Sequence, residues 1–153
     1  MKETLKKIWW KVPLYSAVAG FASYWFMVGV VGRFAYVRLP DGTVSSNDTL
    51  WMIASGAVFA AALLLGGLLF FRRMTRKEIA CSATVMVLIN VVMAVLSSLL
   101  PSGIAMLIVY TREWHAFVVD VLLELGVGGR LATVISWAAV YLFVPFGKKD
   151  VAA

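Results

Sequence analysis

One stretch, residues 103–125, places three acids and the only histidine of the chain near one another in sequence. On a helical wheel, Glu113, Asp120 and Glu124 fall within about 40° of one another and form a narrow acidic stripe. The carboxylates of Asp120 and Glu124, one turn apart, could attract a cation or a basic ligand. We favour the alternative that this stripe is the solvent face of an interfacial helix, with its charge balanced by nearby arginines.

Helix geometry separates His115 from these acids. On the same wheel, His115 lies about 200° from Glu113 and about 140° from Asp120, so one straight helix cannot build a histidine–carboxylate site from them. A binding or catalytic role for His115 would need partners from another segment. Because it follows Trp114, which we expect at the outer membrane boundary, we predict that His115 is an interfacial polar group.

The sequence lacks the motifs of several enzyme classes. Cys81 is the only cysteine, which excludes disulfide exchange within the chain and a cysteine-rich metal site. Neither a G-x-x-x-x-G-K-[ST] nor a G-x-G-x-x-G turn is present, and the apolar windows hold no nucleophile paired with a base. We therefore expect no catalytic residue, no metal and no cofactor, and we favour a non-enzymatic protein over an enzyme.

Asn90 is a polar residue in the middle of a long apolar window. An amide at that depth in a membrane must find hydrogen-bond partners, and we favour a helix–helix contact worth about 0.6–2 kcal/mol. The alternative is a transport path. Ser97 lies seven residues after Asn90, on the same helix face, so the two could line such a path together with Ser98.

Composition places these residues in a membrane protein. Of the 153 residues, 62% are hydrophobic, against about 45–50% in soluble domains, and only 14% are charged, against about 25%. This leaves too little polar surface to cover a soluble domain of this size. It also excludes a disordered chain, a disulfide-stapled secreted domain and a free nucleic-acid binder, although the net charge is +6.

Four windows without charged residues predict four transmembrane helices, because a charge at the bilayer centre is costly. We place these helices at residues 12–32, 50–71, 79–100 and 128–147. Pro101 ends the third helix, and Arg130 must reach the outer interface for the fourth to be long enough. Residues 103–125 carry too many charges to span, so we expect a helix that lies in the outer interface or folds back as a re-entrant segment.

The loop between the first two spans carries a turn signature. In Leu39-Pro40-Asp41-Gly42, proline sets one backbone angle and glycine tolerates a positive φ at the next position. We therefore predict a small hairpin-like excursion outside the membrane.

Lys and Arg residues predict the orientation. Ten of the 14 lie on the side that holds both termini and the middle loop, and four lie on the other side. The positive-inside rule then places both termini in the cytoplasm, and we expect a multi-pass protein of the bacterial cytoplasmic membrane. We also expect four residues of the middle loop to contact anionic lipid, namely Arg72, Arg73, Arg76 and Lys77.

Small residues recur at every fourth position in the second span, a spacing that lets helices approach closely. The pairs are Gly56 with Ala60, Ala57 with Ala61, and Ala62 with Gly66. The sequence does not say whether the neighbour is another helix of the chain, a second copy or a partner protein. We predict an all-α bundle of four transmembrane helices in a single domain, acting as an accessory subunit or homo-oligomeric scaffold. The alternatives are a small transporter or channel with a polar path along the third span and, less favoured, a lipid-modifying enzyme that uses His115.

Overall fold

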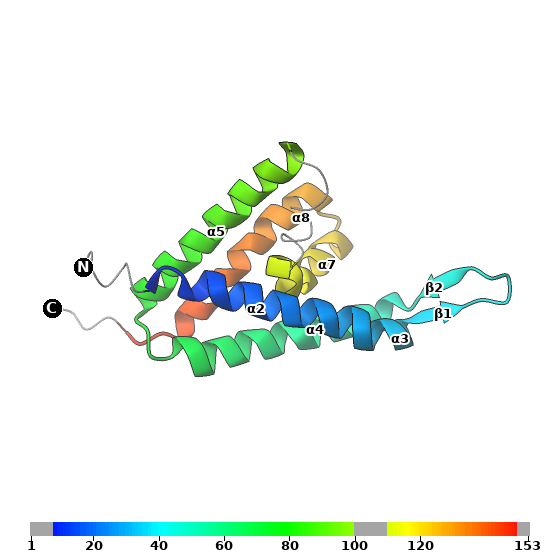
Figure 1. The fold of residues 1–153 in the computed structure, drawn as a ribbon, viewed down its shortest axis with the longest axis horizontal. Coiled ribbons are helices and arrows are strands. Elements are labelled where there is room, and N and C mark those ends of the chain that lie inside the picture. Colours follow the sequence, from blue (N-terminus) through cyan, green and yellow to red (C-terminus); the bar gives the residue numbers. More distant parts are fainter. Residues whose placement is uncertain (1–7, 100–109, 150–153) are drawn as a thin grey trace.

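The computed structural model describes residues 8–99 and 110–149, and its four long apolar helical segments confirm the prediction of a four-helix membrane protein (Figure 1). The first segment consists of α2 (Lys11–Phe26), the π-helical turn η1 (Met27–Val31) and α3 (Gly32–Ala35). The second consists of α4 (Asp48–Leu65) and the π-helical η2 (Gly66–Phe71). The third is α5 (Arg76–Leu99), and the fourth joins α8 (Gly129–Ser136) to the 3₁₀-helical η4 (Trp137–Phe146). The expected helix end at Pro101 and the start of the 103–125 segment lie outside the described residues.

Local hydrogen bonds determine where two of these helices begin. The side chain of Asn47 accepts a hydrogen bond from the backbone N–H of Leu50 at 3.0 Å and caps α4. Before α5, Thr75 and Glu78 form a reciprocal capping box: the Thr75 N–H donates to Glu78 Oε2 at 2.8 Å, and the Glu78 N–H donates to Thr75 Oγ1 at 3.3 Å. Both starts are therefore encoded by residues next to the helix.

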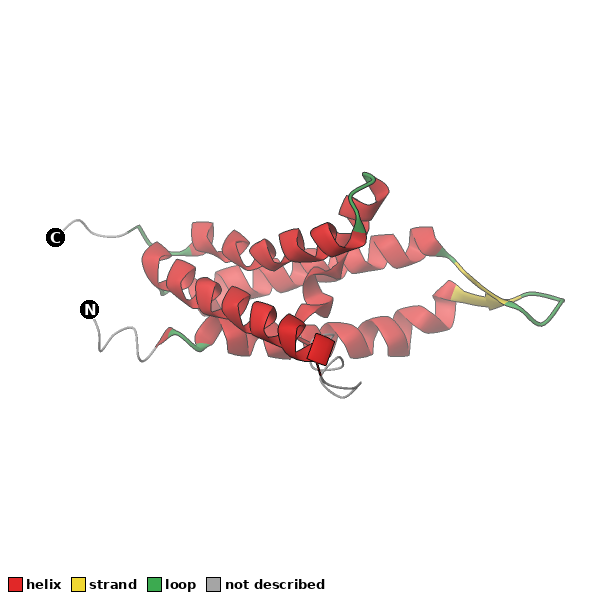
Figure 2. Ribbon diagram, turned by 90° about the horizontal axis from the view of Figure 1, so that it is seen from above, coloured by secondary structure: helices red, strands yellow, loops and turns green. Residues whose placement is uncertain are grey.

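The predicted hairpin between the first two segments is confirmed. Strands β1 (Tyr36–Arg38) and β2 (Val44–Ser46) pair antiparallel and project beyond the helices (Figures 1 and 2). Gly42 has a φ of 84°, which an L side chain rarely adopts. The carboxylate of Asp41 accepts hydrogen bonds from the hydroxyl and the N–H of Thr43, and these bonds lower the pKa of Asp41.

The helices form a wedge rather than a parallel bundle. The first and second segments approach each other near the hairpin, where η1 and α3 contact α4, and an open groove separates α2 from α4. The third and fourth segments, α5 and η4, lie next to each other and diverge from the first two (Figure 1). The α4–α5 turn lies at the same end as the start of α2 and the end of η4, and the hairpin lies at the opposite end. Among the described residues, the basic side chains of the turn and of the two chain ends are thus gathered at one end.

A shorter helical stretch between the third and fourth segments fills this wedge. It consists of a helical turn that ends at Arg112, the 3₁₀ turn η3 (Glu113–His115) and α7 (Ala116–Glu124). The ring of Trp114 stacks on Phe59 of α4, with 5.9 Å between ring centroids, and lies 5.3 Å from Phe143 of η4. Of the two arrangements expected from the sequence, the folded-back one therefore agrees with these contacts.

The expectation that Trp114 lies at the outer boundary is wrong, because Trp114 is fully buried. The physical reason is the divergence of the helices. A wide indole that touches both α4 and η4 closes a gap that the four long segments leave between them.

Gly20 allows η3 to approach α2. A Cβ at this position would overlap the carbonyl oxygen of Tyr110, which is backbone and cannot rotate away. We expect Gly20→Ala to lower the free energy of unfolding by about 1–3 kcal/mol, as overpacking does. The measurement is denaturant unfolding in mixed micelles.

Gly29, in the same membrane segment, is the matched control. A Cβ there would meet nothing within 4 Å, so Gly29→Ala should be neutral or stabilising by up to about 1 kcal/mol. Equal destabilisation by both substitutions would contradict the close contact between η3 and α2.

Candidate functional site

Two of the three predicted acids come together between α4 and α7. Asp120 Oδ2 accepts a hydrogen bond from the Ser55 hydroxyl at 3.3 Å. Burial raises the pKa of Asp120, and burial together with the charge of Asp120 raises the pKa of Glu113. Glu124, at the end of α7, is exposed. The stripe therefore divides into an inward pair and one solvent-facing carboxylate.

The structure describes no set of three or more His, Cys, Asp or Glu residues, within residues 8–99 and 110–149, that could hold a metal ion. The Glu113–Asp120 pair has too few ligands for a hard divalent cation, which takes six or more oxygen atoms.

His115 is fully buried, so the expectation of an interfacial group is wrong. Its ring packs edge-on against Trp114, with 5.0 Å between centroids, and neither ring nitrogen has a hydrogen-bond partner. Burial, and secondarily the charge of Arg112, lowers the pKa of His115 to about 3. His115 is therefore neutral at physiological pH, and no contact joins it to Glu113 or Asp120.

Arg112 is one of the arginines near the acidic stripe, and it belongs to a second polar cluster that was not predicted from the sequence. Its guanidinium carbon lies 6.0 Å from the ring centroid of Trp137, a cation–π arrangement. Arg112 Nε and Trp137 Nε1 are both buried without a hydrogen-bond partner, and burial lowers the pKa of Arg112. The signal in the sequence was the Arg112–His115 run, which places polar residues in an otherwise apolar stretch.

Hydroxyl groups of the third segment are used within the protein. Ser82 Oγ donates to the Trp9 carbonyl at 2.9 Å and accepts from the Val12 N–H at 3.0 Å, joining α5 to the start of α2. Thr84 Oγ1 lies 2.8 Å from the hydroxyl of Tyr141 in η4. These bonds fit a packing role for the polar groups of this segment.

Three polar residues were suggested for a transport path. The side chain of Ser98 lies outside the described residues, and Asn90 and Ser97 differ in their surroundings. Asn90 is buried, and its Nδ2 has no hydrogen-bond partner. Ser97 Oγ donates to the carbonyl of Ala94, one turn back in the same helix, at 2.9 Å. No hydrogen bond joins Asn90 to Ser97 among the described residues.

The four basic residues of the α4–α5 turn are exposed, and they lie at the end that holds the start of α2 and the end of η4 (Figure 1). They are Arg72, Arg73, Arg76 and Lys77. Contact of these residues with anionic lipid stays a prediction.

The structure separates the three small-residue pairs of the second segment. A Cβ at Gly56 would lie 3.1 Å from the Phe117 ring, and one at Gly66 would lie 2.7 Å from the Phe143 ring, so both glycines face the protein's own interior. Ala57 and Ala61 instead line an open groove between α2 and α4. Of the three pairs, this is the one whose two residues are both exposed.

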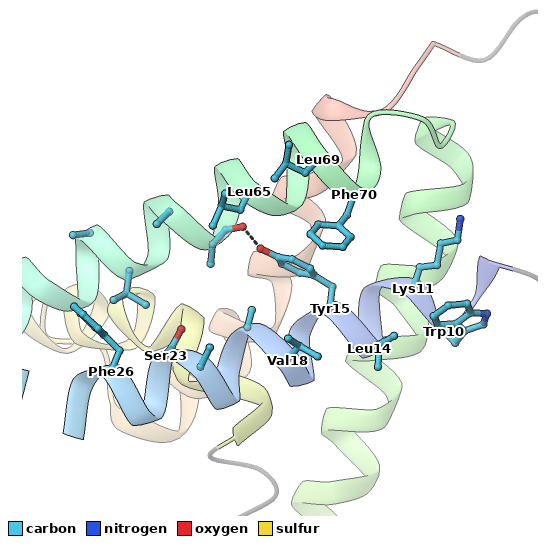
Figure 3. A pocket seen from close by; sticks show the side chains of 16 residues that line it. Trp10, Lys11, Leu14, Tyr15, Val18, Ser23, Phe26, Leu65, Leu69 and Phe70 are labelled. Carbon is cyan, nitrogen blue, oxygen red and sulfur yellow. Dashed lines mark hydrogen bonds between the residues drawn. The ribbon is translucent and has the colours of Figure 1, made fainter. Parts of the chain in front are cut away.

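The groove has a volume of about 930 Å³ and almost entirely apolar walls (Figure 3). Trp10 and Lys11 lie toward one end and Phe26 toward the other. The hydroxyl of Tyr15 donates to the carbonyl of Ala62 at 2.5 Å and ties the two helices together.

The buried neutral His115 predicts a pH effect on stability. Between pH 6.5 and about 3, His115 binds fewer protons in the folded protein than in the unfolded chain. Its contribution to the free energy of unfolding should therefore fall by up to about 1.4 kcal/mol per pH unit as the pH drops below 6.5. His115→Gln should remove this contribution to the pH dependence of the free energy of unfolding. The raised pKa values of Glu113 and Asp120 change stability in the opposite direction, but both acids are present in the wild type and in His115→Gln. Their effect therefore cancels in the difference between the two proteins.

The measurement is the free energy of unfolding of the wild type and His115→Gln at pH 8, 6.5 and 5. A parallel pH dependence in the two proteins would contradict the burial of His115 in a neutral state.

Comparisons with known proteins do not identify a relative. No family model, no curated protein and no solved structure matches this chain. What the chain does is therefore inferred from its own residues and geometry.

Proposed function

We propose that this membrane protein is a non-enzymatic accessory subunit that binds one transmembrane helix of another membrane protein in the groove between α2 and α4. The observation that carries this proposal is the Ala57–Ala61 pair, which has the spacing of a helix-docking surface and whose two residues are exposed and line the groove. The glycines of the other two pairs, Gly56 and Gly66, face aromatic side chains of the protein itself.

The length of the groove fits a membrane-spanning helix. Its α2 wall, Lys11–Phe26, has 16 residues, which at 1.5 Å per residue extend roughly 24 Å. This is most of the roughly 30 Å hydrocarbon thickness of a bilayer. A partner helix that lies along α2 and α4 can therefore contact both through most of its apolar length.

The chemistry of the walls favours close backbone approach. Hydrophobicity does not drive helices together in lipid, so association relies on van der Waals packing, which small side chains improve. Ala57 and Ala61 supply such a surface on α4, and Ala19 and Ala22 supply it on α2. Lys11 is the charged residue of the lining, so an acidic or polar residue is expected near that end of the partner helix.

The concave shape favours a different protein over a second copy. In a two-fold dimer, each chain presents the same surface to the other. Two facing grooves would leave a space between them, whereas a single convex helix fills one groove. A homo-oligomeric scaffold is thus the less favoured form of the interaction hypothesis.

A transporter or channel is the second candidate, and one observation favours it. Asn90 Nδ2 is buried without a partner, as a group that lines a polar path could be. The hydroxyls of Ser82, Thr84 and Ser97 instead make hydrogen bonds within the protein, and this supports the packing role.

Ala61→Leu tests the proposal, because a leucine there would fill the groove. Native extraction into nanodiscs, followed by mass measurement and identification of each chain, should give a stoichiometric partner for the wild type. We expect Ala61→Leu to reduce the retained partner about tenfold, the effect of losing roughly 1.4 kcal/mol. The fold should be intact, since Ala61 is exposed.

Ala60→Leu is the matched control. Ala60 is the adjacent residue of α4 and is also exposed, but it does not line the groove. Its variant should retain the partner. Equal retention of the partner by both variants would overturn the proposal. Cross-linking from single positions of α4 gives a second test. The proposal is also overturned if the partner cross-links at position 60 instead of 61, or if a second copy of this chain cross-links at position 61.

A further inference from the structure

We infer that Arg112, Trp137, Trp114 and His115 form a binding site for an oxyanion, such as the phosphate of a lipid headgroup or free phosphate. This inference is independent of the helix-docking groove. It starts from buried polar atoms that have no hydrogen-bond partner, which folded proteins rarely leave unsatisfied.

The unpartnered groups lie close together. Arg112 stands over the ring of Trp137 at 6.0 Å, and Trp114 and His115 are in ring contact at 5.0 Å. Arg112 also lies near enough to His115 to affect its protonation. The unsatisfied atoms are Arg112 Nε, Trp137 Nε1, Trp114 Nε1 and both ring nitrogens of His115. Three of the four side chains, all except that of Arg112, are more than nine-tenths buried.

The hydrogen-bonding groups of these side chains favour a ligand that accepts hydrogen bonds. Arginine and the tryptophan indoles only donate hydrogen bonds, and a neutral histidine offers one donor and one acceptor. Water molecules would bring further hydrogens that need acceptors of their own. An oxyanion can accept from several donors at once and needs no donor in return.

The charge of the site also favours a bound anion. Arg112 supplies the positive charge, and it forms no ion pair within the described residues. Of the two nearest acids in sequence, Asp120 accepts a hydrogen bond from Ser55, and burial together with the charge of Asp120 raises the pKa of Glu113 and so favours its neutral form. A guanidinium that has lost part of its hydration and lacks a counter-ion is stabilised by a bound anion.

Access to the site is provided by Arg112, which is only half-buried. The site is built by Arg112, at the end of the turn before η3, together with η3 and η4, and it does not depend on a glycine-rich phosphate motif.

The experiment measures thermal unfolding of the purified full-length protein in uncharged maltoside micelles as inorganic phosphate is added. In parallel, native mass spectrometry records phospholipid that remains bound after release from nanodiscs of phosphatidylcholine with or without phosphatidylglycerol. A ligand that binds the folded state raises the unfolding midpoint. Saturable stabilisation by inorganic phosphate indicates a free anion, whereas a single retained phospholipid without that effect indicates a headgroup.

Three variants test which residues bind the anion. Arg112→Gln should abolish the stabilisation and the retention. Trp137→Phe keeps an aromatic ring but removes the N–H, and it should weaken binding about tenfold, the usual loss for a hydrogen bond to a charged group. Arg130→Gln removes an exposed arginine of α8 and should bind like the wild type.

The inference is overturned if neither phosphate nor phospholipid binds to the wild type, since buried water then satisfies these donors. It is also overturned if Arg112→Gln binds like the wild type, or if Arg130→Gln loses binding equally. Should Arg112→Gln fail to fold, unchanged binding by a folded Trp137→Phe variant would decide against the site.

Discussion

The contact of Trp114 with both Phe59 and Phe143 is the interaction on which the arrangement of the other elements depends. The four long segments diverge, and without a filler the gap between α4 and η4 would expose the interior. The 3₁₀ turn η3 brings the indole into this gap, and Gly20 makes room for the backbone that precedes it. Packing of apolar rings at this point therefore holds two pairs of helices in one unit.

The insertion of Trp114 between the helices also brings polar side chains into the interior. The residues beside Trp114 in sequence are Arg112, Glu113 and His115, and they enter the protein with it. Glu113 is partly buried and is affected by the charge of Asp120, whereas Arg112 and His115 have buried polar atoms that make no hydrogen bond. The apolar contact that stabilises the fold thus also creates the donor-rich region near Trp137.

The two proposed sites lie on different parts of this architecture. The groove lies between α2 and α4, two of the long apolar segments, and its walls are almost entirely apolar. The donor cluster follows from the wedge between α4, η3 and η4. A substitution in one region can therefore be studied without removing the residues that build the other.

The helical segments and the hairpin could be predicted from the sequence, because they depend on hydropathy and on turn residues. The predicted starts at residues 50 and 79 were late, since α4 begins at Asp48 and α5 at Arg76, where capping side chains extend each helix beyond its apolar window. Tertiary structure alone decided where residues 110–124 lie and which small-residue pair stays open. The wheel for Glu113, His115 and Asp120 assumed one straight helix, but a 3₁₀ turn at Glu113–His115 precedes α7. The burial of His115 and Arg112 likewise depends on contacts with Trp114 and Trp137, and pairings between distant segments leave no periodic signal in the chain.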